Sequence, residues 1–217
     1  MQQLALFDLD GTLVDRRAAF AAWAGEFVAG RGLDDGALTW LLDADARTTG
    51  ARGPFFGTVR DQFTLREPAD ELWRQYRLRM PELVRCRPED LDAIRQLRSA
   101  GWRIGIVTNG MTDNQRGKIR RTGLDRLVDA WCISGEVGIR KPDTRIFRLA
   151  AQRCCASAEQ GGWMIGDDPV LDVRGGRNAG LRTILLRPGT AADQVDEPKP
   201  DFVASSVADA VNLLLSA

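Results

Sequence analysis

LALFDLDGTLVD, residues 4–15, is the stretch of sequence that decides the fold. Its apolar residues predict a buried β-strand over residues 4–9, and the Gly-Thr pair that follows predicts a turn. The strand runs directly into Asp8 and Asp10. Because ionised carboxylates do not stabilise a buried strand, we interpret these two aspartates as functional groups placed at the end of the strand.

Short apolar segments of this kind recur along most of the chain and alternate with helical patterns. We expect strands at residues 4–9, 103–107, 130–134, 163–165, 183–186 and 202–204, and helices at residues 88–100, 115–122, 144–154 and 172–179. This alternation predicts an α/β fold in which helices cover both faces of a parallel sheet. Ligands of such sheets bind beyond the carboxyl ends of the strands.

The segment 16–85 interrupts this alternation, because it contains only helical patterns. We expect helices there at residues 18–29, 36–46, 57–65 and 68–79. The sequence therefore predicts two domains, a catalytic core formed by residues 1–15 and 86–217 and a helical insertion over residues 16–85 that caps the strand ends. Near the C-terminus, the polar stretch 191–200 predicts a loop before the last strand and a final helix.

The composition restricts the class of protein. Basic and acidic residues balance at 30 each, so bulk charge gives no reason to expect nucleic acid or a membrane surface as a partner. No apolar segment approaches the ~20 residues that span a bilayer. The N-terminus lacks a basic leader, and the four cysteines lack CxxC spacing. We therefore expect reduced, buried cysteines in a cytoplasmic protein. The many Arg, Ala and Gly residues indicate a bacterial source, and the sequence leaves the oligomeric state open.

The types of side chain that are missing restrict the chemistry further. The chain contains no histidine, which excludes Ser-His and Cys-His nucleophile pairs and zinc sites built from histidine. It also lacks a Gly-Lys-Ser/Thr phosphate loop. An enzyme built from this chain must use carboxylates, hydroxyls, backbone amides and a few cations. Only three of the 30 basic residues are lysines, so each lysine is a candidate for a specific role; they are Lys118, Lys141 and Lys199.

Polar residues also follow three other predicted strands. They are Thr108, Asn109 and Gly110 after the second strand, Lys141 after the third, and Asp167, Asp168 and Asp172 after the fourth. Because the carboxyl ends of parallel strands meet at one edge of a sheet, we expect these side chains to lie near Asp8 and Asp10. Several carboxylates in one small site repel one another unless a cation joins them, and hard oxygen ligands suit Mg²⁺.

This set of side chains fits phosphoryl transfer. A carboxylate can attack phosphorus itself, so Asp8 can form an aspartyl-phosphate without help from a histidine. The second carboxylate, Asp10, can protonate the leaving oxygen and then accept a proton from water. Thr108 and nearby amides can bind the phosphoryl oxygens, while Lys141 and Mg²⁺ offset their charge.

Four segments, in order, resemble the motifs of the haloacid dehalogenase (HAD) superfamily: DLDGT, VTNG, RKPD and GDDPVLD. The resemblance implies that Asp8 is the nucleophile, that Asp10 is the general acid/base and that Lys141 assists them. It implies that the metal ligands are Asp8, Asp10 and Asp167. The phosphate-binding residues that it implies are Thr108, Asn109, Gly110 and Lys141. The supporting acids are Asp168 and Asp172. It also implies a Rossmann-like core, a mobile helical cap of the C1 type and dependence on Mg²⁺.

The resemblance favours a phosphatase that acts on a small phosphorylated metabolite. A phosphomutase shares every core motif, and the sequence does not exclude it. In a metal-independent 2-haloacid dehalogenase, Asp8 would attack carbon, but halide leaves unprotonated and the acid Asp10 would have no use. The complete set of motif residues argues against an inactive binding module; they are Asp8, Asp10, Thr108, Lys141 and Asp167. The natural substrate and the cap residues that select it cannot be read from the sequence.

Overall fold

The computed structural model describes residues 3–216, except residues 49, 51 and 188–198. The chain forms two compact units, one from Met1–Asp15 and Arg85–Ala217 and the other from Arg16–Val84. We call them the core unit and the helical unit. The boundary after Asp15 is the one expected from the sequence, and the second boundary differs from the expected one by a single residue. The roles of catalytic core and cap stay predictions. Most of the loop predicted at 191–200 lies outside the described residues.

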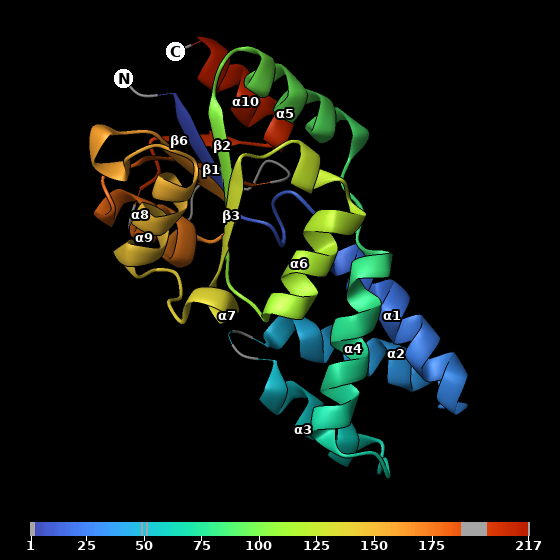
Figure 1. Ribbon diagram of the computed structural model, residues 1–217. Helices are drawn as coiled ribbons and strands as arrows, with labels where there is room; N and C mark the ends of the chain where they lie inside the picture. The colour runs from blue at the N-terminus through green and yellow to red at the C-terminus, as the bar shows by residue number, and fades with distance from the viewer. Residues whose placement is uncertain (1–2, 49, 51, 188–198, 217) are drawn as a thin grey trace. The chain divides into compact units, whose positions relative to one another are not determined.

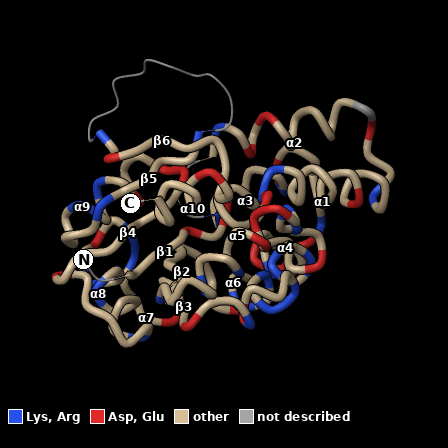
Figure 2. Tube along the Cα trace, turned by 90° about the horizontal axis from the view of Figure 1, so that it is seen from above, with Lys and Arg blue, Asp and Glu red and all other residues tan. Residues whose placement is uncertain are grey.

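In the described part of the core unit, six strands form one parallel sheet in the order β3-β2-β1-β4-β5-β6 (Figure 1 and Figure 2). The strands are β1 (Leu4–Phe7), β2 (Arg103–Thr108), β3 (Ala130–Ile133), β4 (Trp163–Gly166), β5 (Arg182–Leu186) and β6 (Phe202–Ala204). All of the predicted strands are confirmed. The first ends at Phe7, earlier than predicted, because a turn begins at Leu9, whose carbonyl accepts a hydrogen bond from the N–H of Val14 at 3.0 Å.

The central strand explains why the opening stretch is apolar on every residue. β1 pairs with β2 on one side and with β4 on the other, so Leu4–Phe7 is buried on both faces. The ladder continues one residue further, since the N–H of Asp8 donates to the carbonyl of Ile165 at 2.9 Å. This bond holds the first aspartate at the carboxyl end of the sheet.

Helices cover both faces of the sheet, as predicted for an α/β fold (Figure 1). One face carries α8 (Thr144–Arg153) and α9 (Gly175–Asn178), and the other carries α5 (Pro88–Ser99), α6 (Thr112–Arg121) and α10 (Val207–Ser216). The short helix α7 (Ser134–Val137) follows β3. Helix α6 begins three residues before its predicted start at 115. Basic and acidic residues are interspersed along the trace (Figure 2).

The helical unit consists of α1 (Arg16–Arg31), α2 (Asp35–Arg47), α3 (Gly53–Gln62) and α4 (Ala69–Leu83). The four helices confirm the predicted helical patterns, although α3 begins earlier than expected because Pro54 suits the first turn of a helix. Buried aromatic rings fill its centre: the ring of Trp23 lies 5.1 Å from that of Tyr76 and 5.7 Å from that of Phe56. Aromatic packing thus gives this unit a hydrophobic core of its own.

The segments that lead into and out of the helical unit are joined by a hydrogen bond within the core unit. The N–H of Asp15 donates to the carbonyl of Arg85 at 3.1 Å. All of the residues between these two positions therefore form one closed insertion in the chain.

The cysteines and the helices bear on two further expectations. All four cysteines are free, and Cys132 and Cys154 are buried. Cys155 is exposed, so its interpretation as a core residue is wrong. Within the part of the chain that the structure describes, no helix has the length and apolar character needed to cross a bilayer.

The buried Asp45 generates a prediction about the stability of the helical unit. Its carboxylate accepts two hydrogen bonds from Arg16, at 3.0 and 2.9 Å, and also pairs with Arg52. Asp45→Asn would leave both guanidinium groups without their counter-ion, so we expect it to lower the free energy of unfolding by about 1–3 kcal/mol. Urea unfolding followed by tryptophan fluorescence measures this change. Asp43→Asn, at an exposed position of the same helix, is the control and should change it by less than about 0.5 kcal/mol. Equal unfolding midpoints for the two variants would contradict the assigned role.

Candidate active site

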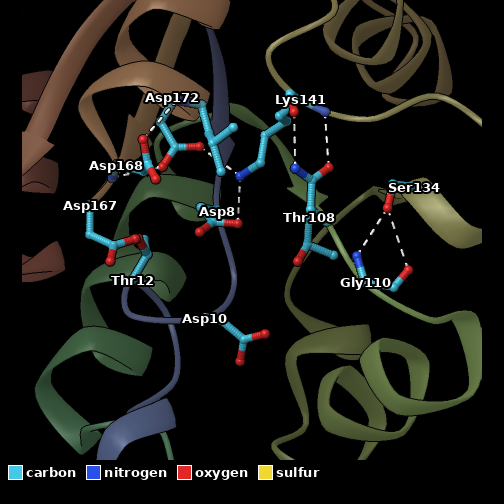
Figure 3. A network of polar contacts seen from close by, with 12 residues as sticks. Asp8, Asp10, Thr12, Thr108, Gly110, Ser134, Lys141, Asp167, Asp168 and Asp172 are labelled. Carbon is cyan, nitrogen blue, oxygen red and sulfur yellow. Dashed lines mark hydrogen bonds and ion pairs between the residues drawn. The ribbon is translucent and has the colours of Figure 1, made fainter. Parts of the chain in front are cut away.

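Lys141 lies at the centre of an acidic cluster at the carboxyl ends of β1 and β4 (Figure 3). Its Nζ is 2.7 Å from Oδ1 of Asp8 and 2.6 Å from Oδ1 of Asp172. Burial alone would lower the pKa of Lys141, but the negative charges of Asp172 and Asp8 outweigh it and raise that pKa. The lysine is therefore a fixed positive charge that holds two strand ends together.

The negative charge of the cluster exceeds what Lys141 can neutralise. One carboxylate oxygen from each of Asp8, Asp167 and Asp172 lies within 4.8 Å of the other two. Burial raises the pKa of Asp8 to about 7, with Lys141 opposing the shift and Asp172 adding to it. Removal of water from around its carboxyl group, and then the negative charge of Asp8, raise the pKa of Asp167 to about 7. The residue nevertheless keeps an exposed surface. Three carboxylates facing one ammonium group make a site that favours a further cation.

Two glycines allow the carboxylates to come this close. Gly11 has a φ of 85°, and a Cβ at that position would overlap the carboxylate of Asp167. A Cβ at Gly166 would overlap the carboxylate of Asp172. Neither position accepts a larger residue without displacing an acidic side chain of the cluster.

The remaining residues of the fourth motif support the cluster. The Oδ1 atom of Asp168 accepts hydrogen bonds from the N–H groups of Val170 and Leu171, both at 2.8 Å, and so caps the π-helical turn Pro169–Arg174. The N–H of Asp168 donates to Oδ2 of Asp172 at 3.1 Å. Both oxygens of Asp172 are thus engaged, one by Lys141 and one by this amide. Asp8 and Asp167 are the carboxylates best placed to receive a metal ion.

The second motif occupies the neighbouring loop after β2. The side chain of Asn109 forms two hydrogen bonds with the backbone of Lys141: Nδ2 donates to the carbonyl at 3.1 Å, and Oδ1 accepts from the N–H at 2.9 Å. The N–H of Gly110 donates to Oγ of Ser134 at 3.0 Å. The Asn109 amide therefore positions Lys141, and its predicted part in phosphate binding stays a prediction. Sequence reasoning did not find Ser134, because a single serine after a strand carries no distinctive pattern.

The carboxylate of Asp10 has partners of its own. Nζ of Lys118 donates to both of its oxygens, at 2.7 and 2.8 Å, and Nε2 of Gln115 donates to Oδ2 at 2.9 Å. The same nitrogen of Gln115 lies 2.7 Å from Oγ1 of Thr108. Neither Gln115 nor Lys118 was predicted as a site residue. For Lys118 a signal existed, because lysine is rare in this chain.

The structure thus gathers the predicted residues into two groups. Asp8, Lys141, Asp167 and Asp172 form the acidic cluster, with Thr12 beside Asp167 at 3.3 Å. Asp10 and Thr108 are joined through α6. Both groups lie at the carboxyl edge of the sheet, where ligands of parallel sheets bind (Figure 3).

The sequence profile of the haloacid dehalogenase-like hydrolases matches residues 2–180, which is most of the chain. The chain belongs to this family. The HAD resemblance predicted from the four motifs is confirmed, and with it the Rossmann-like α/β fold.

Individual HAD proteins resemble the chain to different extents. Phosphoserine phosphatase of Thermus thermophilus is 38% identical over 137 residues, which are 63% of this chain and 52% of that protein. Phosphoglycolate phosphatase of Agrobacterium fabrum is 28% identical over 96% of this chain and 90% of its own length. The chain spans about half the length of several curated relatives that it matches.

A solved structure shows the same fold over the whole chain. The HAD-hydrolase YfnB of Bacillus subtilis, crystallised with magnesium bound, superposes with a TM-score of 0.77. The alignment covers 99% of both chains at 22% sequence identity. At this identity the likeness concerns the fold.

The contact between Gly11 and Asp167 generates a prediction. Gly11→Ala would place a side chain in the left-handed region and push it against the Asp167 carboxylate, so we expect a loss of about 1–3 kcal/mol in the free energy of unfolding. Gly25→Ala is the matched control, because Gly25 lies within α1 and a Cβ there would meet no atom within 4 Å beyond its chain neighbours and the backbone of its own helix. It should stabilise the protein by about 0.5–1 kcal/mol. Urea unfolding measures both, and a Gly11→Ala variant as stable as the parent would refute the assignment.

Proposed function

We propose that this protein is a magnesium-dependent phosphatase that hydrolyses a small phosphorylated metabolite through an aspartyl-phosphate on Asp8. The observation that carries the proposal is the pairing of the buried Asp8 carboxylate with Lys141 beside Asp167, while a second carboxylate, Asp10, follows two residues later with separate partners. The similarity to phosphatases of phosphoserine and phosphoglycolate supports a small phosphate ester as the substrate class.

In the first half-reaction, a carboxylate oxygen of Asp8 attacks phosphorus, and the bond between phosphorus and the ester oxygen breaks. Asp10 gives its proton to the departing oxygen, so an alcohol leaves. The hydroxyl of Thr108 donates a hydrogen bond to a phosphoryl oxygen and keeps its proton. The ammonium of Lys141 stabilises the negative charge that accumulates on the phosphoryl group.

In the second half-reaction, the Asp10 carboxylate accepts a proton from water as that water attacks phosphorus. The bond between phosphorus and the Asp8 oxygen breaks, which releases inorganic phosphate and restores both carboxyl groups. The charge on Lys141 assists again, because the same phosphoryl oxygens become more negative.

The acidic cluster fits a magnesium ion. Its donors are carboxylate oxygens, which Mg²⁺ prefers, and their charge exceeds that of Lys141. Asp8 and Asp167 would hold the ion, and Asp10 is the further ligand implied by the family resemblance. When bound, the ion supplies positive charge that draws the phosphoryl group toward Asp8.

The direct test of this proposal is loss of the nucleophile. Asp8→Asn should lower kcat for 4-nitrophenyl phosphate, assayed with Mg²⁺, by a factor on the order of 10⁴ or more. The wild-type protein, quenched in acid during turnover of a ³²P-labelled substrate, should carry the label on Asp8. Asp43→Asn, at an exposed position of the helical unit, should retain full activity. Label on another residue, or substantial turnover by Asp8→Asn, would refute the mechanism.

Magnesium affinity should fall as the pH is lowered through 7. In the absence of a metal ion, the pKa values of Asp8 and Asp167 lie at about 7, and both carboxyls must lose their protons before they bind a cation. Above pH 7 both are ionised, whereas below it each bound ion must displace protons. We expect the dissociation constant for Mg²⁺, measured by calorimetry, to rise at least about tenfold between about pH 8 and about pH 6. Affinity that is independent of pH, or unchanged by Asp167→Asn, would contradict the metal assignment.

A further inference from the structure

Two polar side chains on the inner face of α6 are almost completely buried. Gln115 and Lys118 lie one helical turn apart, and their exposed fractions are 1% and 2%. A buried amide or ammonium group destabilises a protein unless it finds polar partners. The partners of these two residues are Asp10 and Thr108, to which the proposed reaction gives direct roles.

The chemistry of Gln115 determines how its neighbours are oriented. An ionised carboxylate only accepts hydrogen bonds, so the Gln115 atom that lies 2.9 Å from Asp10 must be the amide nitrogen. Its second N–H then donates to Oγ1 of Thr108 at 2.7 Å. Because the Thr108 oxygen accepts this bond, its own proton points toward a different acceptor. A phosphoryl oxygen needs such a donor.

Lys118 determines the orientation of the carboxylate. Its Nζ contacts both oxygens of Asp10, at 2.7 and 2.8 Å, which restrains the rotation of the carboxylate about its last side-chain bond. Its side chain is 3% exposed and that of Asp10 is 22% exposed, so the lysine is enclosed while the carboxylate keeps an accessible edge. Because the carboxylate is ionised in these contacts, it takes up the proton that it later gives to a bound ester only at that edge.

We propose that Gln115 and Lys118 are positioning residues for phosphoryl transfer: Lys118 orients Asp10, and Gln115 orients both Asp10 and the hydroxyl of Thr108. This inference rests on the proposed function. Its chemical consequence concerns the leaving group. A basic leaving oxygen must receive the proton of Asp10 as its bond to phosphorus breaks, whereas a weakly basic one departs without it. Misplacing Asp10 therefore slows the two kinds of substrate unequally.

The test compares two substrates of nearly the same shape, phenyl phosphate and 4-nitrophenyl phosphate, since nitrophenolate is the much weaker base. Lys118→Met keeps the length of the side chain and removes its charge. We expect kcat/KM for phenyl phosphate to fall by about 10²-fold, and that for 4-nitrophenyl phosphate by less than about threefold. Gln115→Met should lower the ratio of kcat/KM for phenyl phosphate to that for 4-nitrophenyl phosphate as much as Lys118→Met does. In addition, it should lower kcat/KM for both substrates by about tenfold, because Thr108 loses its orientation.

Arg120→Met is the matched control, because it removes a cation from the exposed face of the same helix. It should leave both values unchanged. A merely structural role of Lys118 or Gln115 would reduce the fraction of active enzyme and lower both substrates equally. An unchanged ratio between the two substrates would thus overturn the inference.

Two further measurements keep the test decisive. In an Asp10→Asn background, Lys118→Met should not alter the ratio any further, and an additional change would show that Lys118 acts elsewhere. If Lys118→Met fails to fold, the ratio measured for Gln115→Met alone decides. A wild-type protein that hydrolyses neither phosphate would instead refute the proposed function, so the two failures are distinguishable.

Discussion

The buried ammonium of Lys141, bound between Asp8 and Asp172, is the interaction on which the rest of the site depends. It joins the end of the central strand to the loop after β4, and its own backbone is held by Asn109 from the end of β2. Three strand ends therefore converge on one residue. A buried ion pair of this kind is costly to break, because removing one partner leaves an uncompensated charge in a poorly solvated place. The ion pairs of Lys141 that are proposed to act in the reaction therefore also hold these loops in fixed positions relative to one another.

The two aspartates of the first motif are placed in different electrostatic surroundings although only one residue separates them. Asp8 is buried among other carboxylates, and burial raises its pKa. Asp10 is partly exposed and has a lysine and an amide of its own. Division of labour between paired carboxylates rests on differences of this kind, because a nucleophile and an acid/base need different environments. The turn at Gly11 comes directly after these two residues, whose carboxylates have different partners.

The sequence predicted the sheet, and it predicted for physical reasons that acidic residues would gather at one edge of it. Asp10, predicted as a metal ligand with Asp8 and Asp167, instead has separate partners in the structure. A strand buried on both faces is apolar at every position, as in Leu4–Phe7, and parallel strands bring their carboxyl ends to one edge. Gln115 and Lys118 were not predicted as site residues. Each contacts Asp10, more than 100 residues away in sequence, and such contacts depend on how α6 packs against the sheet. Helical periodicity shows that two residues share a face, but it does not show what that face meets.

The hydrogen bond between Asp15 and Arg85 has a consequence for how the chain could have been assembled. Because the two ends of the helical insertion are hydrogen-bonded to each other in the core unit, the insertion is equivalent to a single closed loop between two adjacent positions of the core. The entropy of closing a loop grows only slowly with its length, so helices could be added, lost or exchanged at this point with little penalty to the sheet. The core unit and the helical unit can therefore diverge at different rates, each constrained by its own hydrophobic interior.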